Sequence, residues 1–169
     1  NELSKKHGVS VDYFEVDLTE KTSAEKIHTW VIEKQYKVNF LINNAGMGGV
    51  GAFEEYSFEY VNQMLELNII ATTNLTHYFI PELKKNAPSH LLNNASMIAN
   101  FPCPYKSIYA ASKVYVKNFT SALRVELDPY NISVSVLQPG ATPTNKIVIN
   151  QINNGGFLAR ISVTNVKVV

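Results

Sequence analysis

The sequence contains a single cysteine, Cys103, among its 169 residues. One thiol cannot form an intramolecular disulfide. This scarcity is typical of a reducing compartment, so we expect a cytoplasmic location. Cys103 lies in FPCPY, where the prolines indicate a turn, and no partner motif marks the thiol as reactive. The four histidines lack the spacing of metal ligands, so no metal site is expected.

Blocks of like charge and long apolar runs are also missing. Fifteen basic and fourteen acidic residues give a net charge of +1 without a basic cluster, which argues against nucleic acid and against an anionic membrane surface. Spanning a bilayer takes about 20 apolar residues. The nearest approach, NIIATTNLTHYFI, is interrupted by Thr72, Thr73, Asn74 and His77. We therefore expect neither nucleic acid nor membrane as a partner.

Segments with strand character alternate with segments of helical periodicity along the chain. The strand-like segments are 11–18, 38–44, 90–96 and 132–140, and the helical ones are 22–36, 57–86 and 107–130. The apolar run 38–44 is typical of a strand that is buried on both faces of a parallel sheet. In the helix 57–86, Pro81 is expected to cause a bend or a local disturbance near the end.

This alternation is the pattern of βαβ units, and it predicts an α/β fold. We expect one Rossmann-like domain over 1–169, a doubly wound parallel sheet with helices on both faces, and an uncertain tail over 150–169. Ligands of such sheets bind beyond the carboxyl ends of the strands. Those ends carry polar or turn-forming residues, namely Asp17, 43–46, Ser96 and 138–140.

The glycine-rich segment GMGGVG, residues 46–51, formally matches the G-x-G-x-x-G pattern of a dinucleotide phosphate loop. In that motif a helix begins at the loop, so that its amides meet the pyrophosphate. Here AFEEYS intervenes and the helical pattern begins near Ser57. We therefore favour a flexible loop that lines a substrate pocket.

Five motifs follow one another in a distinctive order. NNAG (43–46) ends a strand, Asn68 lies inside a helix, Ser96 follows a strand, YAASK (109–113) lies in the next helix, and LQPGAT (137–142) ends the last strand. In this order and spacing the chain resembles the short-chain dehydrogenase/reductase family from about residue 10 to residue 144. NNAG and its placement favour the family's shorter oxidoreductase branch over the sugar-nucleotide branch, which would need a longer substrate domain.

The resemblance implies that Asn68, Ser96, Tyr109 and Lys113 are catalytic. Hydride transfer to or from a nicotinamide requires a proton to move at the substrate oxygen, and a free tyrosine titrates near pH ~10. Lys113 lies one helical turn beyond Tyr109, where its positive charge favours the phenolate. Ser96 would polarise the substrate oxygen. Asn68 would support a water chain that leads to Lys113.

The cofactor contacts are also implied by the resemblance. They lie at the adenine, the adenosine ribose, the nicotinamide ribose and the nicotinamide turn, and the residues are Asp17, Leu18, Asn43, Ala45, Gly46, Tyr109, Lys113, Pro139, Gly140 and Thr142. The cofactor is NADP or NAD, with a slight preference for NADP. The substrate is a small carbonyl or alcohol compound, and Phe53, Met97 and Phe101 suggest an apolar pocket wall.

Each of these residues also has an ordinary structural interpretation when taken alone. Ser96 caps a turn, Asn68 forms a buried hydrogen bond between helices, Asp17 caps a turn, and Tyr109 with Lys113 lies on a helix surface. Their joint order favours the catalytic interpretation.

The chain also departs from the family. The family's first strand, glycine-rich phosphate loop, helix and second strand have no counterpart here. Without the two strands that would separate them, 11–18 is expected to have no neighbour and 38–44 becomes an apolar edge. We expect a piece of a longer protein that binds nucleotide weakly or not at all by itself.

Three functions remain open at this point. The leading one is a carbonyl/alcohol oxidoreductase, and the others are a non-catalytic binding module of the same fold and a sugar-nucleotide enzyme. Apolar residues on several faces of the two long helices predict a homo-oligomer that pairs through them; the residues are Phe79, Ile80, Leu83, Val114, Val116 and Phe119.

Overall fold

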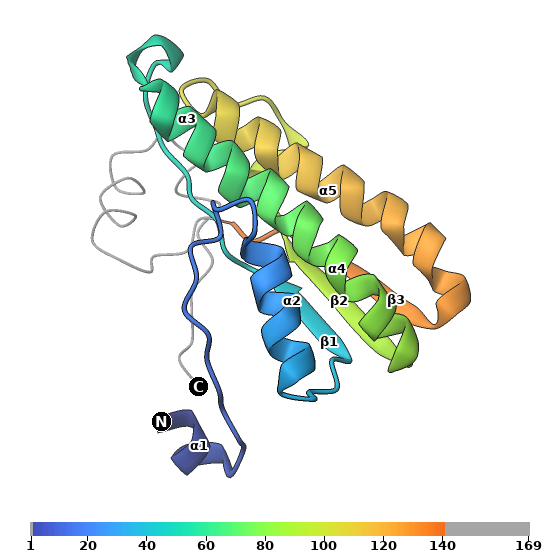
Figure 1. The fold of residues 1–169 in the computed structure, drawn as a ribbon. Helices are drawn as coiled ribbons and strands as arrows, with labels where there is room; N and C mark the ends of the chain where they lie inside the picture. Colours follow the sequence, from blue (N-terminus) through green and yellow to red (C-terminus); the bar gives the residue numbers. More distant parts are fainter. Residues whose placement is uncertain (1, 141–169) are drawn as a thin grey trace.

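The computed structural model describes residues 2–140, which Figure 1 shows as a ribbon. Its helices are α1 (Glu2–His7), α2 (Ser23–Glu33), α3 (Phe58–Leu65), α4 (Thr72–Lys85) and α5 (Ser107–Leu127). Its strands are β1 (Phe40–Asn43), β2 (Ser89–Asn94) and β3 (Ile132–Leu137). Short helical turns lie at η1 (Phe53–Glu55), η2 (Glu66–Ala71), η3 (Met97–Asn100) and η4 (Asp128–Tyr130). The expected helices and three of the four expected strands are confirmed.

The sheet is parallel, as predicted, and its order is β1-β2-β3. Leu41 lies opposite Leu91, and Leu91 lies opposite Val134. Because all three strands run in the same direction, their carboxyl ends meet at one edge of the sheet. This edge, which we call the carboxyl rim, carries the residues that follow Asn43, Asn94 and Leu137.

The hydrophobic core lies between the sheet and helices α4 and α5. Its buried members are Leu83, Leu91, Leu123, Leu127, Ile132 and Val134. Leu83 and Leu91 have no exposed surface, and burial of such a side chain stabilises a fold by roughly 1.5–3 kcal/mol. This packing fixes α5 against β3 and thereby places the YAASK segment at the carboxyl rim.

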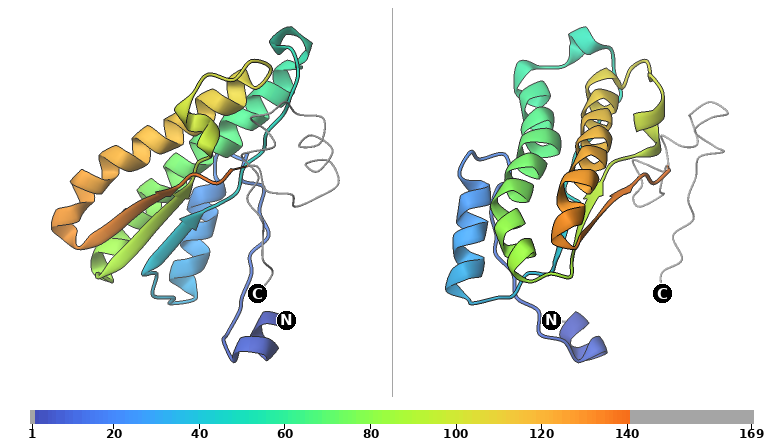
Figure 2. Two further views of the ribbon diagram at one scale, coloured as in Figure 1. Left: turned by 180° about the vertical axis from the view of Figure 1, so that it is seen from behind. Right: turned by 90° about the vertical axis from the view of Figure 1, so that its right-hand side faces the viewer.

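The opposite face of the sheet carries no helix within the described residues. Seen from behind in Figure 2, the strands face the viewer with α2, α4 and α5 beyond them. Phe40 and Ile42 of β1 are 51% and 56% exposed. The expectation that 38–44 is buried on both faces is therefore wrong, because the helices described within residues 2–140 cover one face of the sheet.

The segment 11–18 is not a strand, contrary to our prediction. It is extended, but no strand of residues 2–140 pairs with it, and a single unpaired segment has no ladder of backbone hydrogen bonds. Side chains hold it against α2 instead. Phe14 stacks on Trp30 with ring centroids 5.5 Å apart, and the Tyr36 hydroxyl donates to Asp12 Oδ2 over 2.7 Å. The expectation that 11–18 has no neighbouring strand is therefore confirmed within residues 2–140.

The long helical segment predicted over 57–86 is observed as α3, η2 and α4 in continuous succession. Ser57 caps its start by accepting a hydrogen bond from the Tyr60 amide over 3.2 Å. The turn η2 is π-helical, a widening that is rare and concentrates at functional sites. Asn68 lies inside this turn, and Pro81 lies inside α4.

The two long helices direct most of their apolar residues inward. Phe79, Leu83 and Val116 are at most 3% exposed, so these three cannot form the expected contact between subunits. Val114 and Val125 on α5 do face outward, and they are 37% and 76% exposed. Within residues 2–140, no helix combines the length and the apolar character that crossing a bilayer requires.

Candidate active site

Tyr109 and Lys113 lie one turn apart on α5, as the sequence predicts. Lys113 is only 5% exposed, and its Nζ donates a hydrogen bond to the Asn94 carbonyl over 2.9 Å. The same Nζ lies 5.9 Å from the centroid of the Tyr109 ring. Burial disfavours the charged form of the amine and lowers the pKa of Lys113 below its ordinary value of 10.5.

Gly46 lies between Lys113 and Asn68. A Cβ atom at this glycine would lie 3.3 Å from Lys113 Nζ and 3.1 Å from Asn68 Oδ1. A side chain there would crowd both groups and would displace them by about a few tenths of an ångström, so the close approach favours glycine. Gly46 of NNAG, Asn68 of η2 and Lys113 of α5 therefore lie together at the carboxyl rim.

The Asn68 side chain is buried and fully bonded to the protein. Its Oδ1 accepts from the Met47 amide over 2.9 Å, and its Nδ2 donates to the Met47 carbonyl over 2.8 Å and to Ser112 Oγ over 2.9 Å. This agrees with the ordinary interpretation of Asn68 as a buried hydrogen-bonding residue. None of these three bonds goes to Lys113.

Ser112 is a residue that the sequence analysis did not select. It has no exposed surface, it accepts from Asn68, and its hydroxyl donates to the Tyr109 carbonyl over 2.8 Å. The only sequence feature that marks Ser112 is its position within YAASK. Ala111 lies within the same motif, so the motif alone does not indicate which of the two residues contributes to the site. The Asn68–Ser112 contact fixes η2 to the second turn of α5.

Ser96 follows β2 and caps the short helix η3. Its Oγ accepts a long hydrogen bond of 3.4 Å from the Ile98 amide, and the side chain is half-buried. The next amide, Met97, donates to the Pro139 carbonyl over 3.0 Å. This contact brings Ser96 and the Pro139–Gly140 turn to the same rim as Gly46. Thr142 lies outside the described residues.

Asn43 faces the protein interior rather than the rim. Its Nδ2 donates to Asn93 Oδ1 over 2.8 Å and to Thr76 Oγ1 over 3.0 Å. Asn93 Nδ2 in turn donates to Thr120 Oγ1 over 2.9 Å. All four side chains are at most 7% exposed. They form a polar ladder that links the sheet to α4 and α5. Ala45 and Gly46, by contrast, are exposed.

Asp17 caps a turn in the structure. Its Oδ1 accepts from the Thr19 amide over 2.9 Å and from the Thr19 hydroxyl over 2.7 Å, and these bonds lower the pKa of Asp17. Leu18 accepts a bond of 3.3 Å from the Ser23 hydroxyl at the start of α2. The turn that was one interpretation of Asp17 is therefore present.

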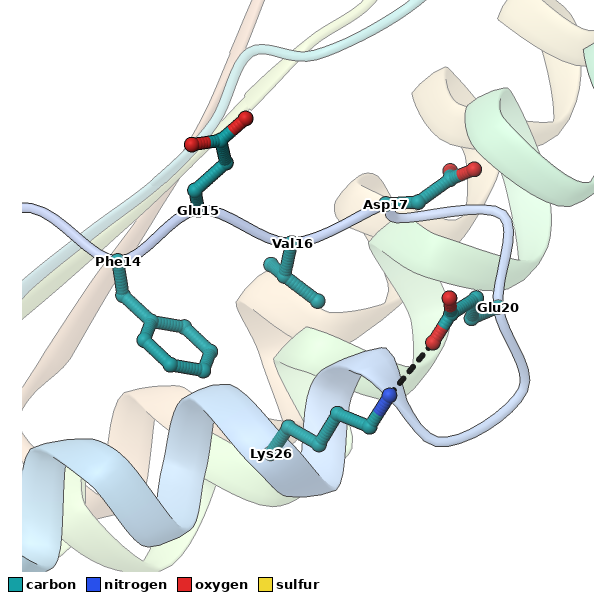
Figure 3. Close-up of a pocket in the computed structure, with 6 residues that line it drawn as sticks. All are labelled: Phe14, Glu15, Val16, Asp17, Glu20 and Lys26. Atoms are coloured by element: carbon teal, nitrogen blue, oxygen red, sulfur yellow. Dashed lines mark hydrogen bonds and ion pairs between the residues drawn. The ribbon is translucent and has the colours of Figure 1, made fainter.

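An open hollow of about 520 Å³ lies beside Asp17 and not over Tyr109. Figure 3 shows its lining: Phe14 and Val16 point toward α2, Glu15 points away from it, and Lys26 reaches the Glu20 carboxylate. The hollow is thus lined by Asp17, the residue at which the adenine is expected.

The residues near Lys113 fit the nicotinamide ribose of a dinucleotide. An ammonium has three donor hydrogens, and the one described bond of Lys113 leaves others for ribose hydroxyls. Within residues 2–140, no glycine-rich loop leads directly into a helix, since η1 separates Gly51 from α3. These residues therefore offer no cradle for the pyrophosphate.

The expected apolar pocket wall is only partly buried. Phe53 and Phe101 are 59% and 42% exposed, and Met97 is half-buried. The glycine-rich segment 46–51, in contrast, packs on the site. A Cβ atom at Gly48 would lie 3.2 Å from Cδ2 of the Tyr109 ring.

Known proteins resemble this chain over most of its length. A sequence model of the family described as short chain dehydrogenase matches residues 1–151. A 3-ketodihydrosphingosine reductase of Bacteroides thetaiotaomicron is 33% identical over 125 residues, which are 74% of this chain and 46% of that protein. The chain spans about half the length of the curated relatives it matches.

Solved structures share the fold. A short-chain dehydrogenase from Sphingobium yanoikuyae in complex with NADPH has a TM-score of 0.77 and 29% identity, and the match covers 83% of this chain and 55% of that one. A 3-ketoacyl-(acyl-carrier-protein) reductase from Brucella melitensis in complex with NADH has a TM-score of 0.70 and 28% identity, with coverages of 81% and 61%. Together with the match over residues 1–151, these findings establish that the chain belongs to the short-chain dehydrogenase/reductase family.

Proposed function

We propose that the protein is an NAD(P)-dependent oxidoreductase that interconverts a carbonyl and an alcohol. One observation carries the proposal. A buried lysine, Lys113, lies one helical turn from Tyr109 at the carboxyl rim, and its Nζ is bonded to the Asn94 carbonyl over 2.9 Å. Burial of a cation without an ion-pair partner is unfavourable, so a function is the simplest reason for it. Among residues 2–140, no carboxylate forms an ion pair with Lys113.

The roles follow from the chemistry of the side chains. When bound, a nicotinamide supplies the hydride that reduces a carbonyl carbon, or accepts one from an alcohol. Tyr109 donates its hydroxyl proton to the substrate oxygen during reduction and takes a proton back during oxidation. The Lys113 ammonium stabilises the phenolate left on Tyr109. The Ser96 hydroxyl donates to the substrate oxygen while negative charge develops there.

Asn68 has a positioning role in this proposal. Its amide is already bonded to Met47 and Ser112, so it holds the turn on which a water route to Lys113 depends. The cofactor contacts are proposed at Asp17 and Leu18, at Ala45 and Gly46, and at Pro139, Gly140 and Thr142. The side chain of Asn43, which the resemblance also implies, is instead engaged with Asn93 and Thr76 in the interior. NADP or NAD is the cofactor, because relatives have been solved with NADPH and with NADH.

Deuterium transfer tests the reaction class directly. The full-length protein is given NADPH or NADH with deuterium at C4 of the nicotinamide, together with a panel of ketones and aldehydes. We expect deuterium on the carbinol carbon of an alcohol product, detected by mass spectrometry. Folded protein that transfers no deuterium from either cofactor to any member of the panel would overturn the proposal.

A second candidate is a non-catalytic module that keeps the fold and binds a partner. The observation in its favour is the open edge of β1 with Phe40 and Ile42 exposed, together with the lack of a pyrophosphate cradle within residues 2–140. The buried Lys113 and its contact with Asn94 favour the enzyme instead.

We further propose a homo-oligomer that pairs through the outer faces of the two long helices. Its support is now Val114, Val125 and Ile70, which are 37%, 76% and 41% exposed. A cytoplasmic location stays a proposal that rests on the single cysteine.

A further inference from the structure

We propose that residues 47–51 form a rigid wall that sets the orientation of the Tyr109 ring, with Gly48 and Tyr60 as positioning residues. We call this segment the glycine wall. Its consequence for catalysis rests on the proposed function, whereas its effect on the Tyr109 ring does not. The inference replaces the flexible loop that the sequence suggests.

Four hydrogen bonds from three directions hold the glycine wall. Met47 is gripped at both its amide and its carbonyl by Asn68, over 2.9 and 2.8 Å. The Tyr60 hydroxyl donates to the Gly48 carbonyl over 2.9 Å, and the Gly51 amide donates to the Tyr105 carbonyl over 2.9 Å. A loop bonded at its start, middle and end has lost most of the freedom that its glycines would otherwise give it.

The wall touches the Tyr109 ring through bare backbone. A Cβ atom at Gly48 would lie 3.2, 3.3 and 3.4 Å from Cδ2, Cε2 and Cγ of this ring. The first two distances are shorter than ordinary van der Waals contacts, so a methyl group at Gly48 would displace the ring by about a few tenths of an ångström. The hydroxyl lies at the far end of the ring, where a tilt moves it most. A misplacement of about 1 Å at a reacting group lowers a rate by roughly 10²-fold.

A pair of tyrosines supports the wall from the other side. Tyr56 and Tyr60 stack with ring centroids 5.2 Å apart, and both hydroxyls crowd Gly49, whose Cβ would lie 2.7 Å from one and 3.0 Å from the other. The two hydroxyls differ in one respect. That of Tyr60 bonds Gly48, whereas that of Tyr56 is buried with no partner among residues 2–140. Burial also raises the pKa of Tyr56.

The chain therefore offers two matched pairs of variants. Gly48→Ala places a methyl group against Tyr109, whereas Gly51→Ala places one no closer than 3.4 Å to Tyr56, an ordinary contact. Tyr60→Phe removes the bond to Gly48, whereas Tyr56→Phe removes a hydroxyl that bonds nothing among the described residues. If Gly48→Ala fails to fold, the comparison of Tyr60→Phe with Tyr56→Phe still tests the inference.

The first measurement needs no activity. The full chain is labelled with 3-fluorotyrosine, and the resonance of Tyr109 among its nine tyrosines is assigned by the loss of one signal in Tyr109→Phe. We expect the fluorine resonance of Tyr109 to shift beyond its linewidth in Gly48→Ala and Tyr60→Phe, and to stay in place in Gly51→Ala and Tyr56→Phe. An unmoved Tyr109 resonance in both Gly48→Ala and Tyr60→Phe overturns the inference.

The second measurement is the activity of the full-length protein. We expect Gly48→Ala to lower kcat by roughly 10-fold with little change in KM, because the ring is displaced by less than the distance of about 1 Å that costs about 10²-fold, and the substrate is not lost. Tyr60→Phe lowers kcat by roughly 2- to 10-fold, the equivalent of one ordinary hydrogen bond. A kcat that survives both changes contradicts the catalytic part of the inference. A shifted Tyr109 resonance in a protein that reduces no carbonyl supports the wall and counts against the proposed function.

Discussion

Lys113 is the single residue at which burial of a charged group coincides with a proposed chemical role. Its amino group is bonded to the Asn94 carbonyl and lies beside the Tyr109 ring, and its pKa is lowered by burial. The sequence identifies this lysine through its spacing from Tyr109. It does not show which carbonyl the lysine contacts, because that carbonyl belongs to β2, 19 residues earlier in the chain.

The lowered pKa of Lys113 makes a prediction about stability. Below the ordinary value of 10.5, the unfolded lysine binds a proton more readily than the folded one, so the free energy of unfolding rises with pH in the window between the two values. Lys113→Met removes this contribution. Denaturant unfolding at a series of pH values should show a smaller rise with pH in Lys113→Met than in the parent.

Lys117→Met is the matched control for this measurement. Lys117 lies one turn further along α5, and its Nζ bonds Asn100 Oδ1 over 2.8 Å at a more exposed position. We expect its pH dependence to follow that of the parent. Equal pH dependence in Lys113→Met and the parent would show that the buried amine is not perturbed.

The π-helical turn η2 is the element that connects the parts of the site. It joins α3 to α4, and its Asn68 is bonded to Met47 in the glycine wall and to Ser112 on α5. Because a π-turn widens the helix, it changes the direction in which one side chain projects. The site therefore depends on an irregular turn inside an otherwise regular helix.

Asn68→Ala should destabilise the chain by roughly 1–3 kcal/mol, because it leaves the Met47 amide and carbonyl without their partner in a partly buried place. Asn62→Ala, at an exposed position of α3, is the control and should stay within about 0.5 kcal/mol of the parent. Thermal or denaturant unfolding measures both. A loss for Asn68→Ala no larger than that for Asn62→Ala would contradict the bonded role of this amide.

The regular elements are predictable from the sequence and the irregular ones are not. Helix and strand periodicity locates α2, α4, α5 and β1 to β3, because their packing faces repeat. The π-turn has no such period, since Asn68 in LELNIIAT appears only as a polar residue in an apolar helix. The segment 11–18 has the composition of a strand, yet pairing depends on a neighbour that its own residues cannot supply.

At the scale of the whole molecule, the sheet described within residues 2–140 has one covered face and an open edge at β1. The covered face holds the core and positions α5, and the site residues Gly46, Ser96 and Pro139 follow the three strands at the carboxyl rim. The site is thus assembled at the end of a small parallel sheet. Within residues 2–140, a place for the pyrophosphate is missing from that sheet.

The 169-residue chain by itself is therefore expected to bind nicotinamide dinucleotides with a dissociation constant above the millimolar range. Residues 2–140 have no loop and helix end to neutralise the two phosphates. Isothermal titration of the chain with NADPH and with NADH measures this. Sub-millimolar affinity for either cofactor would contradict the expectation.

Replacement of Tyr109 by phenylalanine is the sharpest test of the proposed proton transfer. The control is Tyr115→Phe on the same helix. The Tyr115 hydroxyl lies 3.0 Å from Thr73 Oγ1, and no lysine lies four residues after Tyr115 in the sequence. Carbonyl reduction is monitored through the oxidation of the reduced cofactor. We predict that Tyr109→Phe lowers kcat/KM by about 10²- to 10⁴-fold and that kcat/KM of Tyr115→Phe stays near that of the parent. Reduction by Tyr109→Phe at close to the parent's rate would contradict the assignment of Tyr109 as the proton-transferring residue.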